Sequence, residues 1–183
     1  MMIPASRMPR KNILQLLAGG DRRTIGCVDE VVARVSNDRE FFAKLIAELW
    51  SDNPLIRMRA ADAIEKITRR YPELLQRYKN ELLGLMAETQ QQGLRWHLAV
   101  MIPRIALNER EQLTAVSSLI GYLEDSSSIV KTFTLQGLAD FAQREAAIRP
   151  RVIEILREAT RKGTPAMKAR GGKLLVRLGK MSD

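Results

Sequence analysis

The chain has 183 residues, a net charge of +9 at pH 7, 5% aromatic and 28% charged residues. Few aromatic residues with abundant Ala, Leu, Arg and Glu favour an all-α fold over a β fold. The sequence contains no apolar run of about 18 residues, so we expect no membrane-spanning helix. The single cysteine, Cys27, excludes an intrachain disulfide, and with the single histidine, His97, it argues against a zinc site of nitrogen and sulfur ligands.

Residues 1–37 predict a basic N-terminal arm and a degenerate helix pair that caps the fold. The first eleven residues are basic and contain no carboxylate, and they lack the apolar core of a secretory signal. A transit-type targeting segment stays open as an alternative. We expect short helices over residues 12–18 and 25–35, and the single cysteine makes a cytoplasmic location the default expectation.

From Asp38 onward, apolar residues recur with helical periodicity and turn residues separate the segments. Asn108 and Glu111 have the spacing of a capping box. Pro103 lies inside one predicted helix and should bend it, because proline lacks a backbone N–H. We expect helices over residues 38–50, 54–70, 72–88, 94–107, 109–123, 129–143, 150–162 and 166–178.

An internal repeat is the strongest pattern in the sequence. It aligns four basic residues with spacings of 38, 36 and 37: Arg57, Arg95, Lys131 and Lys168. The residue before each is apolar, and apolar residues recur seven and ten positions after each. Such a period predicts four successive helix pairs over residues 38–183, each with a first (A) helix and a second (B) helix.

The segment Asp52-Asn-Pro-Leu-Ile-Arg57, followed by an Ala-rich helix, resembles HEAT repeats. In that family a turn acid and often a proline precede an apolar–basic pair. The resemblance covers nearly the whole chain from Asp38, although Gln91 and Lys162 replace the turn acid in two repeats. It implies a single domain, a right-handed α-α superhelix of about five helix pairs that acts as a scaffold. It also implies structural inter-repeat roles for Arg57, Arg95, Lys131 and Lys168.

Charge divides unevenly between the two kinds of helix. The four A segments carry a net charge of −3, the four B segments +9 and the first 37 residues +3. In HEAT-like stacks the B helices line the concave side, so the resemblance implies a basic concave face, where the electric field is focused.

The B-helix positions outside the apolar stripe are our candidate partner-binding residues. They combine aromatic and basic side chains: Arg59, Lys66, Trp96, His97, Arg104, Phe133, Arg170, Lys173 and Arg177. Such a set can hold an acidic amphipathic peptide. It can equally stack bases and contact phosphates.

Three hypotheses for function therefore stand. The first is a non-catalytic scaffold or adaptor that binds an acidic protein or peptide. The second is sequence-independent binding of DNA or RNA. The third is a HEAT-like DNA glycosylase, which the chain resembles only in general composition, with Asp62 and Asp140 as candidate carboxylates. We expect no cofactor, no metal, no small-molecule substrate and no membrane association.

Overall fold

The computed structural model describes residues 39–180, and within that range the protein is all-helical and contains no strand. The all-α prediction is confirmed. The chain divides into two compact units, and the boundary between Ile64 and Glu65 falls inside a helix. The arm and capping pair predicted for residues 1–37 lie outside the described residues, as do Asp38 and residues 181–183.

The first unit contains helix α3 (Arg39–Ala47), the 3-10 helix η1 (Glu48–Trp50) and the start of α4 (Pro54–Arg70). The apolar stripe of α3 and η1 is buried, as its helical spacing predicted: Phe41, Phe42, Leu45, Ile46 and Leu49. Pro54 opens α4, where the missing N–H costs no helical hydrogen bond. The Asn53 side chain accepts a hydrogen bond from the Leu55 backbone N–H at 2.9 Å.

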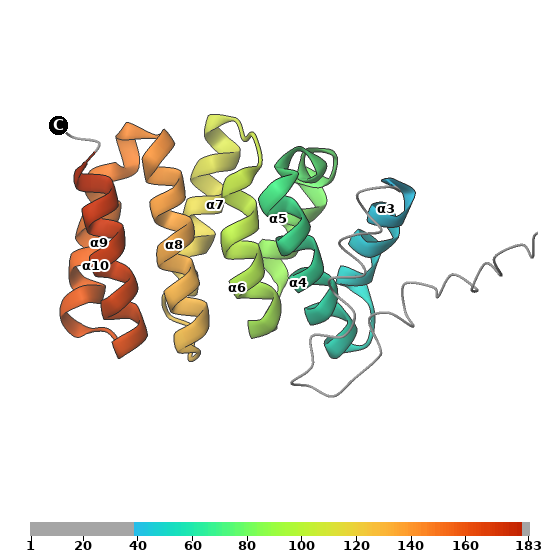
Figure 1. Ribbon diagram of the computed structural model, residues 1–183, viewed down its shortest axis with the longest axis horizontal. Helices are drawn as coiled ribbons and strands as arrows, with labels where there is room; N and C mark the ends of the chain where they lie inside the picture. Colours follow the sequence, from blue (N-terminus) through green and yellow to red (C-terminus); the bar gives the residue numbers. More distant parts are fainter. Residues whose placement is uncertain (1–38, 181–183) are drawn as a thin grey trace, which may run out of the picture. The chain divides into compact units, whose positions relative to one another are not determined.

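The second unit begins at Glu65 within α4 and continues through three further pairs of α-helices (Figure 1). Its elements are η2 (Pro72–Tyr78), α5 (Lys79–Glu88), α6 (Gln92–Met101), η3 (Ile102–Arg104), α7 (Glu109–Tyr122), α8 (Ser128–Arg144), η4 (Ala146–Ile148), α9 (Arg149–Lys162) and α10 (Pro165–Gly179). The capping box at Asn108 and Glu111 is confirmed: each side chain accepts a hydrogen bond from the other residue's backbone N–H.

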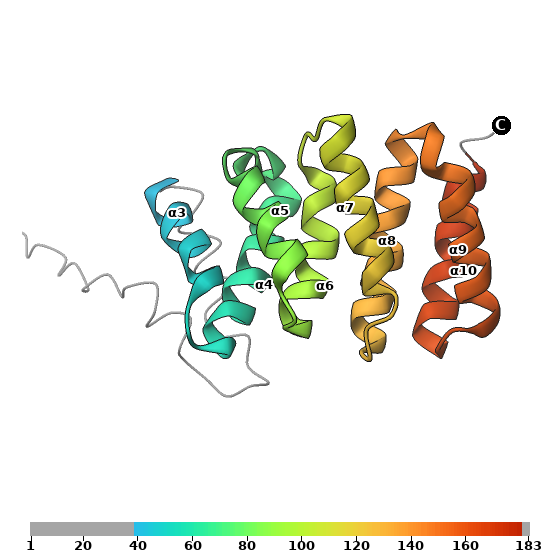
Figure 2. The same cartoon turned by 180° about the vertical axis from the view of Figure 1, so that it is seen from behind.

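Helices α6, α8 and α10 lie side by side in one row, and α5, α7 and α9 lie on the other side of it (Figures 1 and 2). Helix α6 packs on α8 and α8 packs on α10. The close approach of α6 and α8 depends on Gly137, because a Cβ at this position would overlap the carbonyl oxygen of Ala99.

Two predicted helices differ from the structure. Helix α6 ends at Met101 instead of continuing to residue 107, and Pro103 lies in η3. Pro103 has no N–H to donate to the carbonyl of Ala99, so the α-helical pattern stops and an Ile105-to-Ile102 backbone bond of 3.0 Å closes the turn. Residues 72–78 likewise form a 3-10 helix, and the α-helix of that segment starts only at Lys79.

Candidate binding surface on helices α6, α8 and α10

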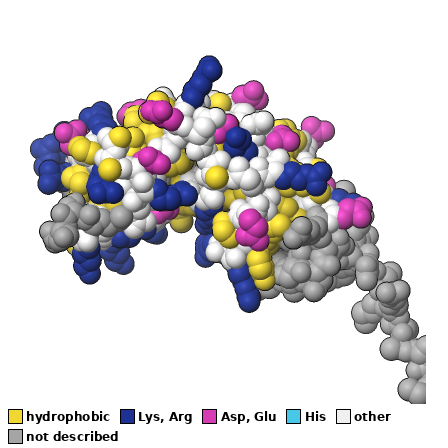
Figure 3. All heavy atoms as spheres, turned by 90° about the horizontal axis from the view of Figure 1, so that it is seen from above, with side chains coloured by type: hydrophobic (Ala, Val, Ile, Leu, Met, Phe, Trp, Pro, Cys, Tyr) yellow, Lys and Arg dark blue, Asp and Glu magenta, His cyan; other side chains and the backbone are white. Residues whose placement is uncertain are grey.

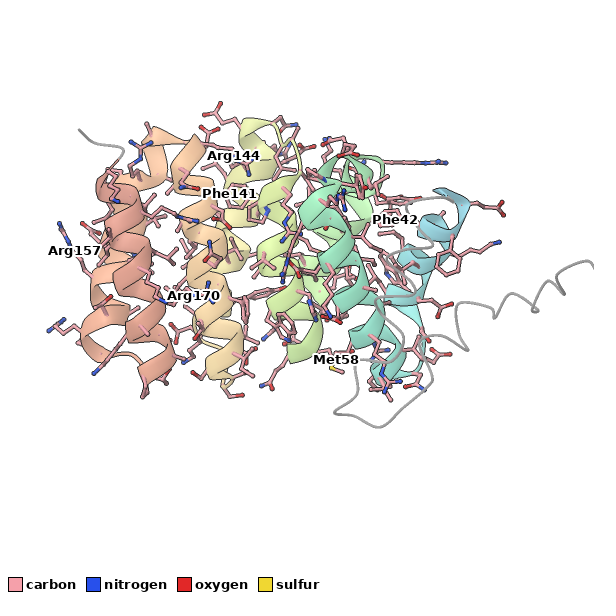
Figure 4. All side chains as sticks on the ribbon, viewed as in Figure 1. Phe42, Met58, Phe141, Arg144, Arg157 and Arg170 are labelled. Atoms are coloured by element: carbon pink, nitrogen blue, oxygen red, sulfur yellow. The ribbon has the colours of Figure 1, made fainter. Side chains whose placement is uncertain are left out.

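Three predicted partner-binding residues form a stacked row across the second unit: Trp96 of α6, Phe133 of α8 and Arg170 of α10. The Trp96 and Phe133 ring centroids are 4.9 Å apart at 35°. The guanidinium carbon of Arg170 lies 5.6 Å from the Phe133 centroid, and Figure 4 shows this side chain reaching from α10 toward α8. All three side chains are half-buried, so part of each remains accessible.

Arg170 is fixed in place from two sides. Its Nη1 donates a hydrogen bond of 2.9 Å to Oε1 of Gln136 on α8, and its charge lies over the Phe133 ring. A guanidinium has five N–H donors, so this bond leaves most of the Arg170 donors available. Lys173 follows one turn later on α10, is exposed, and makes no ion pair with any residue in the 39–180 range.

Arg177, another predicted partner-binding residue, forms an internal ion pair. Its Nη2 lies 2.7 Å from Oδ1 of Asp140 on α8, and Gln136 donates to the same oxygen at 2.8 Å. The two charged residues are 37 positions apart, which is one repeat length. Opposite charges at equivalent positions of neighbouring repeats are the sequence signal that could have predicted this pair.

Arg104 is also engaged within the unit, in a buried polar cluster. It contacts the Glu65 carboxylate, and its Nη1 donates to the Glu65 carbonyl oxygen at 2.8 Å and to Thr68 Oγ1 at 3.0 Å. Arg69 makes two further bonds to the same carboxylate, of 2.8 and 2.6 Å. Burial disfavours the charged form of Glu65, but the two arginines together outweigh that effect and lower its pKa. Sequence reasoning missed Glu65.

His97 is buried, and so is Arg59, although both were predicted to face a partner. That part of the prediction is wrong, because the packed stripe of each helix is wider than the ideal apolar face and includes these positions. The His97 ring lies 3.3 Å from the Trp96 ring between centroids, and neither of its nitrogens has a hydrogen-bond partner among the described residues. Burial lowers the pKa of His97 to about 3. Lys66, the remaining member of the set, is half-buried on α4.

The residues predicted to be structural divide into two groups. Arg57 donates to the Ser51 carbonyl at 2.6 Å and Arg95 to the Thr89 carbonyl at 2.9 Å, each six positions back along the chain. Arg95 also pairs with Asp125 at 2.6 Å, in the turn of the next helix pair. Lys131 is half-buried and Lys168 exposed, and neither has a hydrogen-bonding or ionic partner within residues 39–180.

The two rows of helices differ in charge. Helices α6, α8 and α10 contain one carboxylate, Asp140, against seven basic residues: Arg95, Lys131, Arg144, Lys168, Arg170, Lys173 and Arg177. Helices α5, α7 and α9 contain seven basic residues against six carboxylates. Figure 3 shows Lys and Arg side chains gathered around the α9–α10 end.

Neither a cluster of metal ligands nor a membrane-spanning helix occurs in the described part of the chain. Residues 39–180 contain no group of three or more His, Cys, Asp or Glu side chains placed to hold a metal ion. In the same range, every helix is too short or too polar to cross a membrane. In comparisons with known proteins, no family model matches the sequence, and no curated protein matches it.

Proposed function

We propose that the protein is a HEAT-like helical-repeat scaffold that binds an acidic protein or peptide on the surface of helices α6, α8 and α10. The observation that carries this proposal is the charge of that surface. Asp140, the one carboxylate of these three helices, pairs with Arg177, and Arg95 pairs with Asp125. The other five basic residues of the three helices form no ion pair within residues 39–180.

The stacked row of Trp96, Phe133 and Arg170 supplies the centre of the binding surface. Aromatic side chains and arginine are the residue types that contribute most to protein interfaces. Arg170 is already held by Phe133 and Gln136, so it loses little conformational freedom when it pairs with a partner's carboxylate. Lys173, one turn along α10 from Arg170, extends the positive surface and is exposed.

The HEAT-like architecture is supported by the repeat of about 37 residues and by the alternation of two rows of helices in the second unit. Bonds between successive helix pairs also fit this architecture. Arg95 joins Asp125, and Arg177 joins Asp140. In such arrays each repeat is stabilised mainly by its neighbours.

A fluorescent Glu-rich peptide tests the proposal. The double variant Arg170→Glu with Lys173→Glu should weaken binding about tenfold or more, because it reverses two charges that lie one turn apart on the same side of α10. The matched control is Arg157→Glu with Arg161→Glu, which reverses two exposed charges on α9. Equal losses in both variants would show that binding follows net charge, and no loss in the α10 variant would refute the proposed surface.

Salt dependence separates the peptide partner from nucleic acid. Binding to single-stranded DNA makes the logarithm of the affinity fall linearly with the logarithm of the salt concentration. A peptide anchored on the stacked row should depend less on salt and should lose affinity in Trp96→Ala. If the oligonucleotide binds more tightly than the peptide at about 200 mM salt, the acidic-peptide proposal is replaced by nucleic-acid binding.

A further inference from the structure

A second surface of the protein has a different chemistry. A cavity of about 320 Å³ lies between helices α7 and α9, above α8 and α10. Helix α7 packs on α5 and α8, whereas α9 packs on α8 and α10, and the cavity lies where these two outer helices separate. We call this surface the α7–α9 groove. It is lined by Ile120, Leu123, Glu124, Leu135, Arg151, Ile155, Glu158, Ala159 and Met167.

Six of the nine residues that line the groove are apolar. Leu135 and Ala159 are buried, while Leu123, Ile155 and Met167 are half-buried and Ile120 is 36% exposed. Leu113 precedes Ile120 by seven residues, two turns along the same face of α7, and is 56% exposed. The two side chains extend the apolar surface beyond the cavity. Covering them with a partner would remove apolar area from water, which favours association.

Helical spacing indicates what kind of segment fits. Leu113 and Ile120 are about 10 Å apart along the axis of α7, which equals two turns of a partner helix. An amphipathic helix presents apolar side chains at positions i, i+3 or i+4, and i+7 along one face, and can place them over such a stripe. An extended strand would lack a sheet edge to pair with, because residues 39–180 contain no strand.

The charged residues at the rim of the groove indicate which residues a partner should carry beside its apolar face. Three charged residues line the groove: Glu124, Glu158 and Arg151. Glu158 pairs with Lys162 at 3.1 Å and Arg151 with Glu154 at 3.2 Å, and both are exposed pairs of similar geometry. Glu124 forms no ion pair within residues 39–180, so the lining has an excess of one carboxylate. This excess favours a partner with lysine or arginine beside its apolar face.

We infer that the α7–α9 groove binds an amphipathic helix of a protein partner, which inserts large aliphatic side chains into the cavity and places basic residues beside Glu124 and Glu158. This surface is distinct from the α6–α8–α10 surface, and its partner has the opposite charge. The two surfaces together would let one chain hold two different proteins.

The test uses a designed helical peptide of about 18 residues, five turns, with leucines on one face and lysines on both flanks. A second peptide carries glutamates in place of the lysines, and a third has the lysine-bearing sequence in scrambled order. Methyl NMR spectra of the full chain, with Ile and Leu labelled, report where each peptide binds. The lysine peptide should shift the Ile120, Leu123 and Ile155 methyl signals, and the scrambled peptide should not.

Two variants locate the interaction and two control it. Ile120→Ser and Glu124→Lys should each weaken binding of the lysine peptide about tenfold or more. Ile129→Ser and Val176→Ser replace side chains of α8 and α10 that are 58% and 61% exposed and lie outside the groove, so they should leave binding unchanged. Circular dichroism shows whether each variant keeps its helicity.

Three results would overturn the inference. The first is the absence of methyl shifts in the groove at saturating lysine peptide. The second is an equal loss in the Val176→Ser control. The third is equal affinity of the glutamate peptide at the same methyl groups, because it would show that Glu124 and Glu158 do not select the partner. If the glutamate peptide shifts only methyl signals of α10, it binds the α6–α8–α10 surface and not the groove, as the inference expects.

Discussion

Arg95 of α6 and Asp125 of the turn before α8 are 30 positions apart in the sequence and 2.6 Å apart in the structure. Arg95 also lies over the Tyr122 ring, with its guanidinium carbon 5.0 Å from the centroid. The Asp125 side chain is 2% exposed and accepts further bonds from Gln92 and the Ser127 N–H. Helix α6 is thus tied to the turn that begins the next helix of its row.

Arg95→Ala should destabilise the protein by about 2–3 kcal/mol, because it leaves the buried Asp125 carboxylate without its positive partner. The measurement is the free energy of unfolding in urea at pH 7. The matched control is Lys131→Ala, at the equivalent position of the next repeat, which should change stability by less than about 0.5 kcal/mol. Equal losses would mean that Arg95 acts only through its packing.

Glu65→Gln should cost about 2–4 kcal/mol, since the side chain is 3% exposed and its charge holds both Arg69 and Arg104. Thermal or urea unfolding of this variant gives the value. Glu158→Gln removes an exposed carboxylate paired with Lys162 and should cost about 0.5 kcal/mol or less. A neutral effect of Glu65→Gln would show that the arginines find other acceptors.

Gly137→Ala should destabilise the second unit by about 1–3 kcal/mol, because the added methyl group would overlap the Ala99 carbonyl and push α6 from α8. Gly84→Ala is the control. A Cβ at that helical position meets nothing, so alanine should stabilise the protein by about 0.5–1 kcal/mol. Opposite signs in denaturant unfolding are the expected result, and the same sign in both variants would contradict the close approach.

His97 should make the protein sensitive to acid. Its pKa is lowered to about 3 in the folded chain, against an ordinary value of 6.5, so the unfolded chain binds the proton more readily between these two pH values. The contribution of His97 to stability is then greatest above pH 6.5. It falls by about 1.4 kcal/mol for each pH unit between pH 6.5 and about pH 3.

His97→Phe removes that titration and keeps an aromatic ring in the buried site. Between pH 7.5 and 4.5 the variant should lose about 2–3 kcal/mol less stability than the parent protein, because other acid-sensitive groups are common to both. Urea unfolding at the two pH values gives the comparison. Parallel losses would show that the His97 ring is solvated in the folded state.

The sequence alone was sufficient for the class of the fold and for most helix positions. Apolar periodicity located the helices, the Asn108–Glu111 box gave the start of α7, and Pro54 gave the start of α4. These signals act within a few residues along the chain, so the sequence contains them completely. The local signal was insufficient at Pro103, where the helix ended instead of bending.

The tertiary structure decided which charged side chains are available on the surface. Arg104 and Arg177 were predicted to face a partner, yet Glu65 and Asp140 bind them, and Arg59 and His97 are buried. The separation of α7 from α9 that opens the apolar groove was likewise not readable from the sequence. These outcomes depend on the width of the packed stripe of each helix and on the reach of long side chains between helices. A helical period leaves both undetermined, because it fixes only the centre of the packed stripe.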